Sequence, residues 1–147
     1  MATGVQVVFD CADPDRLARF WAEALGYVLP EPPGGFATWN DFYRSIGVPE
    51  DELDEGADRI VDPDGVGPRM WFQKVPEDKI VKNRLHLDLE VGGGRGLALA
   101  VRKERVDAEV KRLIDLGASI LVVNEEPGMD HYGVTMQDPE GNEFCLS

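Results

Sequence analysis

Cysteine, basic residues and long apolar runs are all scarce in this sequence. Two cysteines, Cys11 and Cys145, are too few for a disulfide framework or a four-thiolate zinc site. No apolar run approaches the roughly 20 residues of a membrane span, and no secretory signal pattern is visible in residues 1–10. We therefore expect a cytoplasmic protein that does not associate with membranes.

The charge balance is acidic, with 15 Lys and Arg against 28 Asp and Glu and a formal net charge of -13. Such a chain repels phosphate backbones and anionic lipid surfaces, so nucleic acid and membranes are excluded as expected partners. The same charge slightly favours a cationic or neutral small-molecule ligand over a phosphate ester. The acidic run at 50–58 is interpreted as a solvated surface, because it lacks the ligand spacing and central glycine of a calcium loop.

A length of 147 residues and a hydrophobic content of 43% are typical of one globular domain. In its first half, Asp13 and Pro14 are a helix start and Gly26 a helix stop. Alternation and turn residues complete the expected order for this half: strand 5–10, helix 14–25, short strand 27–29, short helix 38–46, and strands 59–61 and 69–75.

The second half repeats this plan. Its expected elements are strand 85–90, a glycine-rich segment at 92–105, helix 106–116, and strands 119–123, 132–137 and 143–146. Three pairs of landmarks recur in the same order: Gln6 with His86, Leu25-Gly26 with Leu116-Gly117, and the turn at 62–65 with the turn at 138–141. We interpret the chain as an internal duplication, with modules at about 1–76 and 84–147 and a short linker at 77–83.

Strand alternation sorts the side chains into two faces. The face expected beneath the helices holds Val5, Val7, Phe9, Met70, Phe72, Leu85, Leu87, Leu89, Phe144 and Leu146. The opposite, open face holds Gln6, Trp71, Gln73, His86, Asp88, Glu143 and Cys145. Cys11 falls on the side of Phe9, so alternation disfavours a disulfide between Cys11 and Cys145. These residues alone define a duplicated α+β domain with a polar sheet face.

Three segments carry a resemblance to a known family. They are Val7-Val8-Phe9-Asp10-Cys11-Ala12-Asp13-Pro14 with Phe20-Trp21 and Leu25-Gly26, then Val81-Lys82-Asn83-Arg84-Leu85-His86-Leu87-Asp88-Leu89, and Asp138-Pro139-Glu140-Gly141-Asn142-Glu143-Phe144-Cys145-Leu146. Together they resemble glyoxalase-like proteins of the vicinal oxygen chelate superfamily, which includes glyoxalases, dioxygenases and bleomycin resistance proteins. The resemblance implies two βαβββ modules that form a curved mixed sheet around a U-shaped cavity, and a homodimer.

Enzymes of that superfamily usually hold a divalent metal with residues from the first and last strand of each module. The resemblance places Gln6, His86 and Cys145 at such positions, together with Trp71 or Gln73, depending on the register of the last strand of the first module. Cys145 stands where the family usually has Glu. Because two amides and one thiol hold a hard cation poorly, we expect no tightly bound metal, and zinc if a divalent ion binds weakly.

Two functions follow from the resemblance. The first is a small-molecule enzyme of the lyase or isomerase type, with His86 as base or ligand and Asp88 or Glu143 as a second proton-transfer group. The alternative is a metal-free protein that sequesters a drug-like or aromatic metabolite, with Trp39, Trp71 and Tyr132 lining the cavity. A blander third interpretation is an interaction domain that has lost its site.

Overall fold

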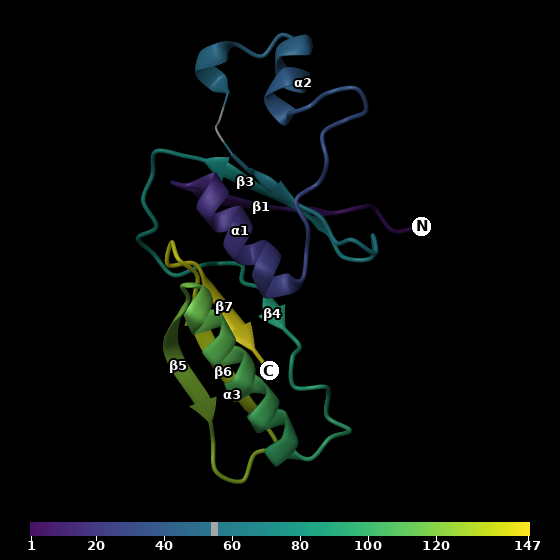
Figure 1. The fold of residues 1–147 in the computed structure, drawn as a ribbon. Coiled ribbons are helices and arrows are strands. Elements are labelled where there is room, and N and C mark those ends of the chain that lie inside the picture. The colour runs from purple at the N-terminus through teal and green to yellow at the C-terminus, as the bar shows by residue number, and fades with distance from the viewer. Residues whose placement is uncertain (54–55) are drawn as a thin grey trace. The chain divides into compact units, whose positions relative to one another are not determined.

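The computed structural model describes residues 1–53 and 56–147 (Figure 1). The chain divides into two compact units, Met1–Pro76 and Glu77–Ser147, and each is described by itself. In the described part of the chain, no helix combines the length and the apolar character that crossing a bilayer requires.

Unit 1 contains β1 (Gln6–Cys11), α1 (Pro14–Leu25), α2 (Trp39–Ser45), the 3-10 helix η1 (Glu50–Glu52), β2 (Arg59–Ile60) and β3 (Arg69–Lys74). The sheet order is β1-β3-β2, with β1 parallel and β2 antiparallel to β3. Helix α1 begins where the Asp13 carboxylate accepts a hydrogen bond from the Arg16 N–H at 3.1 Å, and it ends at Gly26 in the left-handed region.

Helix α1 covers one face of this sheet (Figure 1). Leu17, Trp21 and Phe72 are fully buried between them, and the Phe9 ring lies 5.3 Å from both the Trp21 and the Phe72 ring. The sequence analysis predicted that Phe9 of the first strand and Phe72 of the strand at 69–75 face the helix, and this prediction is confirmed.

Unit 2 contains β4 (Asp88–Leu89), α3 (Leu99–Leu116), β5 (Ser119–Glu125), β6 (Tyr132–Gln137) and β7 (Glu143–Leu146). The sheet order is β4-β7-β6-β5, with β4 parallel to β7 and the remaining pairs antiparallel. The side of the sheet packed against α3 holds the buried core of the unit: Val106 and Leu113 from the helix, and Val134, Met136 and Leu146 from the sheet.

The two units share the central part of one topology, although the sheet of unit 1 has three strands and that of unit 2 has four. In each, the first strand is followed by the main helix and pairs in parallel with the last strand, as β1 does with β3 and β4 with β7. In each, an Asp-Pro turn comes directly before the last strand. The carboxylate of the first Asp in this turn accepts hydrogen bonds from backbone N–H groups, which in unit 1 are those of Asp64, Val66 and Gly67. The α+β fold and its mixed sheets are confirmed.

Several predicted boundaries were wrong. Helix α3 begins at Leu99 and not at the predicted position 106. The prediction missed its first part because Arg102 lies on the inner, buried side of the helix and interrupts the apolar pattern there. The predicted strand 85–90 is reduced to Asp88–Leu89, and Leu85, expected in the core, is 78% exposed. The parallel partner of β4 is β7, which begins only at Glu143 and so does not extend far enough to pair with residue 85. The predicted strand 27–29 is a single bridge between Val28 and Val61.

The acidic run is only partly described, because residues 54 and 55 lie outside the described residues. At its start, Glu50 opens η1 and pairs with Arg44, whose Nε lies 2.5 Å from a Glu50 carboxylate oxygen. Both side chains are exposed, so this pair is an ordinary surface contact.

Candidate functional site

The open face of unit 2 carries a row of polar side chains that crosses three strands. Asp88 of β4 is the pairing partner of Cys145 of β7, and Cys145 is in turn the partner of Thr135 of β6. The Thr135 hydroxyl lies 3.5 Å from the Cys145 sulfur and accepts a hydrogen bond from the Asn124 amide at 3.1 Å. The register therefore places a carboxylate, a thiol and a hydroxyl side by side.

His86 joins this row two residues before Asp88. Its Nδ1 lies 2.9 Å from Asp88 Oδ1, and the possible ligand atoms of His86, Asp88 and Cys145 all lie within 4.8 Å of one another. The side chains of His86 and Asp88 are 38% and 62% exposed, so a small molecule can reach them. The structure thus brings three of the predicted site residues together on one face.

Glu143 has a different environment from these three. Its side chain is only 8% exposed, with one carboxylate oxygen 3.1 Å from the Lys79 ammonium and 3.0 Å from the Asn83 N–H that donates to it. Burial by itself would raise the pKa of Glu143, but the hydrogen bonds from Asn83 and Lys79 outweigh it and hold that pKa below its usual range. Glu143 ties the segment before β4 to the start of β7.

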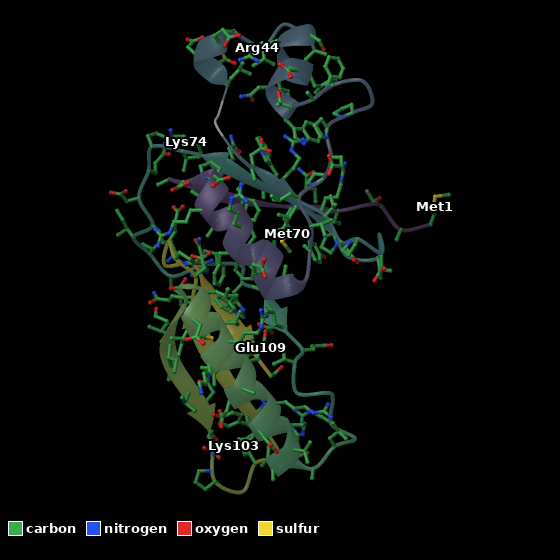
Figure 2. The ribbon with its side chains drawn as sticks, in the orientation of Figure 1. Met1, Arg44, Met70, Lys74, Lys103 and Glu109 are labelled. Atoms are coloured by element: carbon green, nitrogen blue, oxygen red, sulfur yellow. The ribbon has the colours of Figure 1, made fainter. Side chains whose placement is uncertain are left out.

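Tyr132 lies on the opposite face of the sheet from Cys145. It is buried beside α3, where its hydroxyl donates to Asp107 at 2.5 Å and the Lys103 ammonium lies 4.9 Å from the ring centroid (Figure 2 labels Lys103). Burial and the Asp107 carboxylate raise the pKa of Tyr132 to about 12. Alternation along β6 explains the placement, because Tyr132 shares its side with Val134 and Met136. The structure does not bring Tyr132 to the predicted pocket face.

The open face of unit 1 is hollowed by a pocket of about 300 Å³. Two predicted residues line it, Gln6 and Trp71, together with Arg59, Ile60, Val61, Arg69 and Met70. The register explains the grouping: Gln6 is the partner of Arg69, and Trp71 is the partner of Arg59. Gln73 follows on the same face, beside Asp10, and is not part of the lining.

Trp39 is connected to this pocket through Arg59. The Arg59 guanidinium lies 4.6 Å from the Trp39 ring centroid, and its Nε donates to Asp58 at 2.8 Å. The hydrogen bond with Asp58 is the main cause that raises the pKa of Arg59. The Trp39 indole N–H donates to the Pro30 carbonyl at 3.0 Å, so the ring is held in place.

The pairing register also determines which residue of β3 corresponds to Cys145. If Gln6 corresponds to His86, then Val8 corresponds to Asp88, and the β3 partner of Val8 is Trp71. Trp71, not Gln73, therefore occupies the position equivalent to Cys145. An indole offers an N–H donor and no metal-binding lone pair, so this position supplies no ligand.

Three residues of these faces, Arg59, Arg69 and Thr135, were not predicted from the sequence. Each could have been found from alternation, since Arg69 shares the side of Trp71 and Thr135 stands between the core residues Val134 and Met136. The expectation that Gln6, His86 and Cys145 face one shared cavity joins residues of different units and stays a prediction.

Comparison with known proteins adds a family to this geometry. Residues 6–147 match the family described as a glyoxalase-like domain. No curated protein matches the chain. Solved structures, in contrast, resemble it over nearly the whole chain at low sequence identity.

A hypothetical protein from S. aureus is 17% identical, with 99% of this chain and 96% of that chain covered and a TM-score of 0.57. A glyoxalase/bleomycin resistance protein/dioxygenase family enzyme from Burkholderia phytofirmans PsJN is 18% identical, with 96% and 94% covered and a TM-score of 0.58. A mutant of the fosfomycin resistance protein FosX from Listeria monocytogenes, complexed with Mn(II) and 1S,2S-dihydroxypropylphosphonic acid, is 11% identical, with 99% and 92% covered and a TM-score of 0.60. At these identities the likeness concerns the fold.

Proposed function

The chain belongs to the glyoxalase-like domain family, and from this premise we propose that it acts on a small molecule as an enzyme of the lyase or isomerase type. One observation carries the proposal: His86, Asp88 and Cys145 lie within 4.8 Å of one another on an open sheet face. Proton transfer at a carbon next to a carbonyl is the step that such a set of groups suits best.

His86 is the proposed base. An ionised Asp88 carboxylate only accepts hydrogen bonds, so at 2.9 Å it favours the tautomer with the proton on Nδ1. That tautomer leaves the Nε2 lone pair of His86 available to take a proton from a substrate. Asp88 then acts as the positioning residue that orients the ring and stabilises the imidazolium formed in the step.

Cys145 and Thr135 are proposed to contact the substrate on the same face. The hydroxyl and the thiol lie 3.5 Å apart, and each can donate or accept a hydrogen bond. Glu143 was predicted as an alternative second proton-transfer group. We assign that group to Asp88 instead, because Glu143 is buried against Lys79 and Asn83 while Asp88 is open.

The donor set also fits a zinc ion. Imidazole, thiolate and carboxylate are its usual ligands, and three protein ligands with one open position are typical of catalytic zinc sites. Bound there, zinc would supply Lewis-acid polarisation of a carbonyl oxygen, and His86 would then be a ligand and not the base. We propose that His86, Asp88 and Cys145 would hold the ion weakly, since two of the three side chains are substantially exposed to competing water.

The experiment is proton exchange in D₂O. The purified chain is incubated with a panel of aldehydes and 2-oxo acids, and ¹H NMR measures loss of the signal at the carbon beside the carbonyl. We expect His86→Ala to slow exchange by about 100-fold or more. His131→Ala is the matched control, because His131 is the other histidine and is exposed on a different segment. Equal rates for the two variants, or no exchange with any compound, would contradict the proposal.

The second candidate function is metal-free sequestration of an aromatic metabolite. It is favoured by Trp71, which lines the unit 1 pocket and whose side chain makes no hydrogen bond and no aromatic ring contact in the described part of the chain. An aromatic ligand could stack on this ring without any chemistry. Binding of an aromatic compound without turnover would favour this function over the first. We also propose a homodimer in the cytoplasm, which light scattering and cell fractionation would test.

A further inference from the structure

The pocket of unit 1 has a charge opposite to that of the whole chain. Acidic residues outnumber basic ones 28 to 15, yet two arginines and no carboxylate line this pocket. Local charge within hydrogen-bonding distance decides which ligand enters a site, because solution at physiological ionic strength screens charges beyond roughly 8 Å. The net charge of -13 therefore does not describe what this pocket binds.

The two arginines differ in how far they are already neutralised. Arg59 is paired with Asp58, donates to the Tyr43 hydroxyl and lies over the Trp39 ring. Arg69 is exposed, and over residues 1–53 and 56–147 it makes no ion pair. Arg69 is thus the cation that is available to a ligand, while Arg59 is held rigidly as part of the wall.

The neighbours of Arg69 add hydrogen-bond donors and an aromatic surface. Gln6 is its pairing partner on β1 and offers an amide N–H₂ group. Trp71 is two residues along β3 on the same face, half-buried, and offers its ring and its indole N–H. A guanidinium, an amide and an indole N–H around one hollow form a site for an oxyanion attached to a planar group.

We infer that this pocket binds the carboxylate or phosphate group of a small planar molecule, with Arg69 as the anion ligand and Trp71 as the stacking surface. A volume of about 300 Å³ is at the small end of ligand pockets, so the occupant is a metabolite-sized molecule. The inference rests on the proposed function only in calling this molecule a substrate. The inferred ligand class is an anionic planar compound. This differs from the expectation drawn from the net charge, which favoured a neutral or cationic ligand.

The test uses the full chain and tryptophan fluorescence with four probes: benzoate, phenyl phosphate, benzyl alcohol and benzylamine. We expect benzoate or phenyl phosphate to bind at least 10-fold more tightly than benzyl alcohol and benzylamine. The comparison of benzoate with phenyl phosphate identifies the anion. Equal affinity for all four probes, or preference for benzylamine, would overturn the inference.

The variants locate the site. Arg69→Gln is expected to weaken binding of the preferred anion about 10-fold and to leave benzyl alcohol unchanged, and Arg69→Lys is expected to restore part of the loss. Lys74→Gln is the matched control, since Lys74 lies at the end of the same strand (Figure 2) but is paired with Cys11 on the helix-facing side. Equal effects of Arg69→Gln and Lys74→Gln would refute the assignment.

Anion binding can be separated from turnover. His86 belongs to unit 2 and is not among the residues that line the pocket, so His86→Ala should keep the anion affinity of the unmodified chain. If the unmodified chain binds the anion but exchanges no proton with any compound of the panel, this inference stands and the proposed enzyme function fails. If the unmodified chain exchanges protons but binds benzoate and phenyl phosphate no more tightly than benzyl alcohol, the enzyme function stands and this inference fails.

Discussion

Replacing Glu143 by Gln separates a structural from a catalytic role for this residue. The carboxylate accepts a hydrogen bond from the Asn83 N–H at 3.0 Å and lies 3.1 Å from the Lys79 ammonium, in a site only 8% exposed. Hydrogen bonds to charged groups contribute about 1.5–3 kcal/mol and neutral ones about 0.5–1.5 kcal/mol. Gln keeps the Asn83 bond in neutral form and loses the ion pair, so we expect Glu143→Gln to lower the free energy of unfolding by about 1.5 kcal/mol.

The pH dependence gives this prediction a second measurement. The folded-state pKa of Glu143 is lowered from its ordinary value of 4.5. The carboxylate therefore stabilises the fold fully above pH 4.5, and this contribution disappears as pH falls through the lowered folded-state value. Unfolding by urea, followed by circular dichroism at pH 7 and at decreasing acidic pH, should show the unmodified chain and Glu143→Gln converging in stability.

With a urea dependence of about 2 kcal/mol per M, the expected loss moves the midpoint at pH 7 by roughly 0.7 M. Glu126→Gln removes the same charge from an exposed loop and is expected to leave the midpoint within about 0.2 M of the unmodified chain. Equal midpoints for Glu143→Gln and the unmodified chain would refute the structural role and return Glu143 to the candidates for proton transfer.

Three further predictions use other contacts. Tyr132→Phe removes the hydrogen bond to Asp107 and should lower the free energy of unfolding in urea by about 1 kcal/mol. Because the folded-state pKa of Tyr132 is raised to about 12, the stability difference between the two chains should persist below pH 10 and shrink as pH rises towards 12. Leu113→Ala should cost about 3 kcal/mol because Leu113 is fully buried, whereas Leu85→Ala should change stability by less than about 0.5 kcal/mol. Asp88→Asn should weaken zinc binding at least 10-fold in calorimetric titration, and unchanged affinity would exclude Asp88 as a ligand.

Local sequence signals predicted the elements whose ends are set by their own residues. Asp13 and Pro14 start α1 and Gly26 ends it, all through short-range contacts and backbone preference. The last strands of both units were predicted within one residue for the same reason, since alternation and an Asp-Pro turn define them. The fold class followed from the repetition of these signals.

Other features depend on partners distant in the sequence. Leu85 fits the alternation of a buried strand, but burial requires a neighbouring strand and a covering helix, and β7 begins too late to provide the first. Arg102 has the composition of a surface residue, yet it is buried because Leu97 and Asp130 accept its guanidinium hydrogens. The net charge likewise did not predict the arginines of the unit 1 pocket, because it sums the charges of the whole chain and does not give the local charge at one pocket.

The duplicated register places different chemistry at equivalent positions of the two units. Across the open face, unit 1 has Val8, Trp71 and Arg59 where unit 2 has Asp88, Cys145 and Thr135.

The first row offers surface for stacking, beside a pocket that holds the available Arg69, and no side chain that exchanges protons near neutral pH. The second row offers a carboxylate, a thiol and a hydroxyl next to His86. Each unit is therefore expected to act by itself, unit 1 in binding an anion and unit 2 in proton transfer. Arg69→Gln should weaken anion binding and leave proton exchange unchanged, while His86→Ala should slow proton exchange and leave anion binding unchanged. Slower proton exchange in both variants alike would refute this division between the two faces.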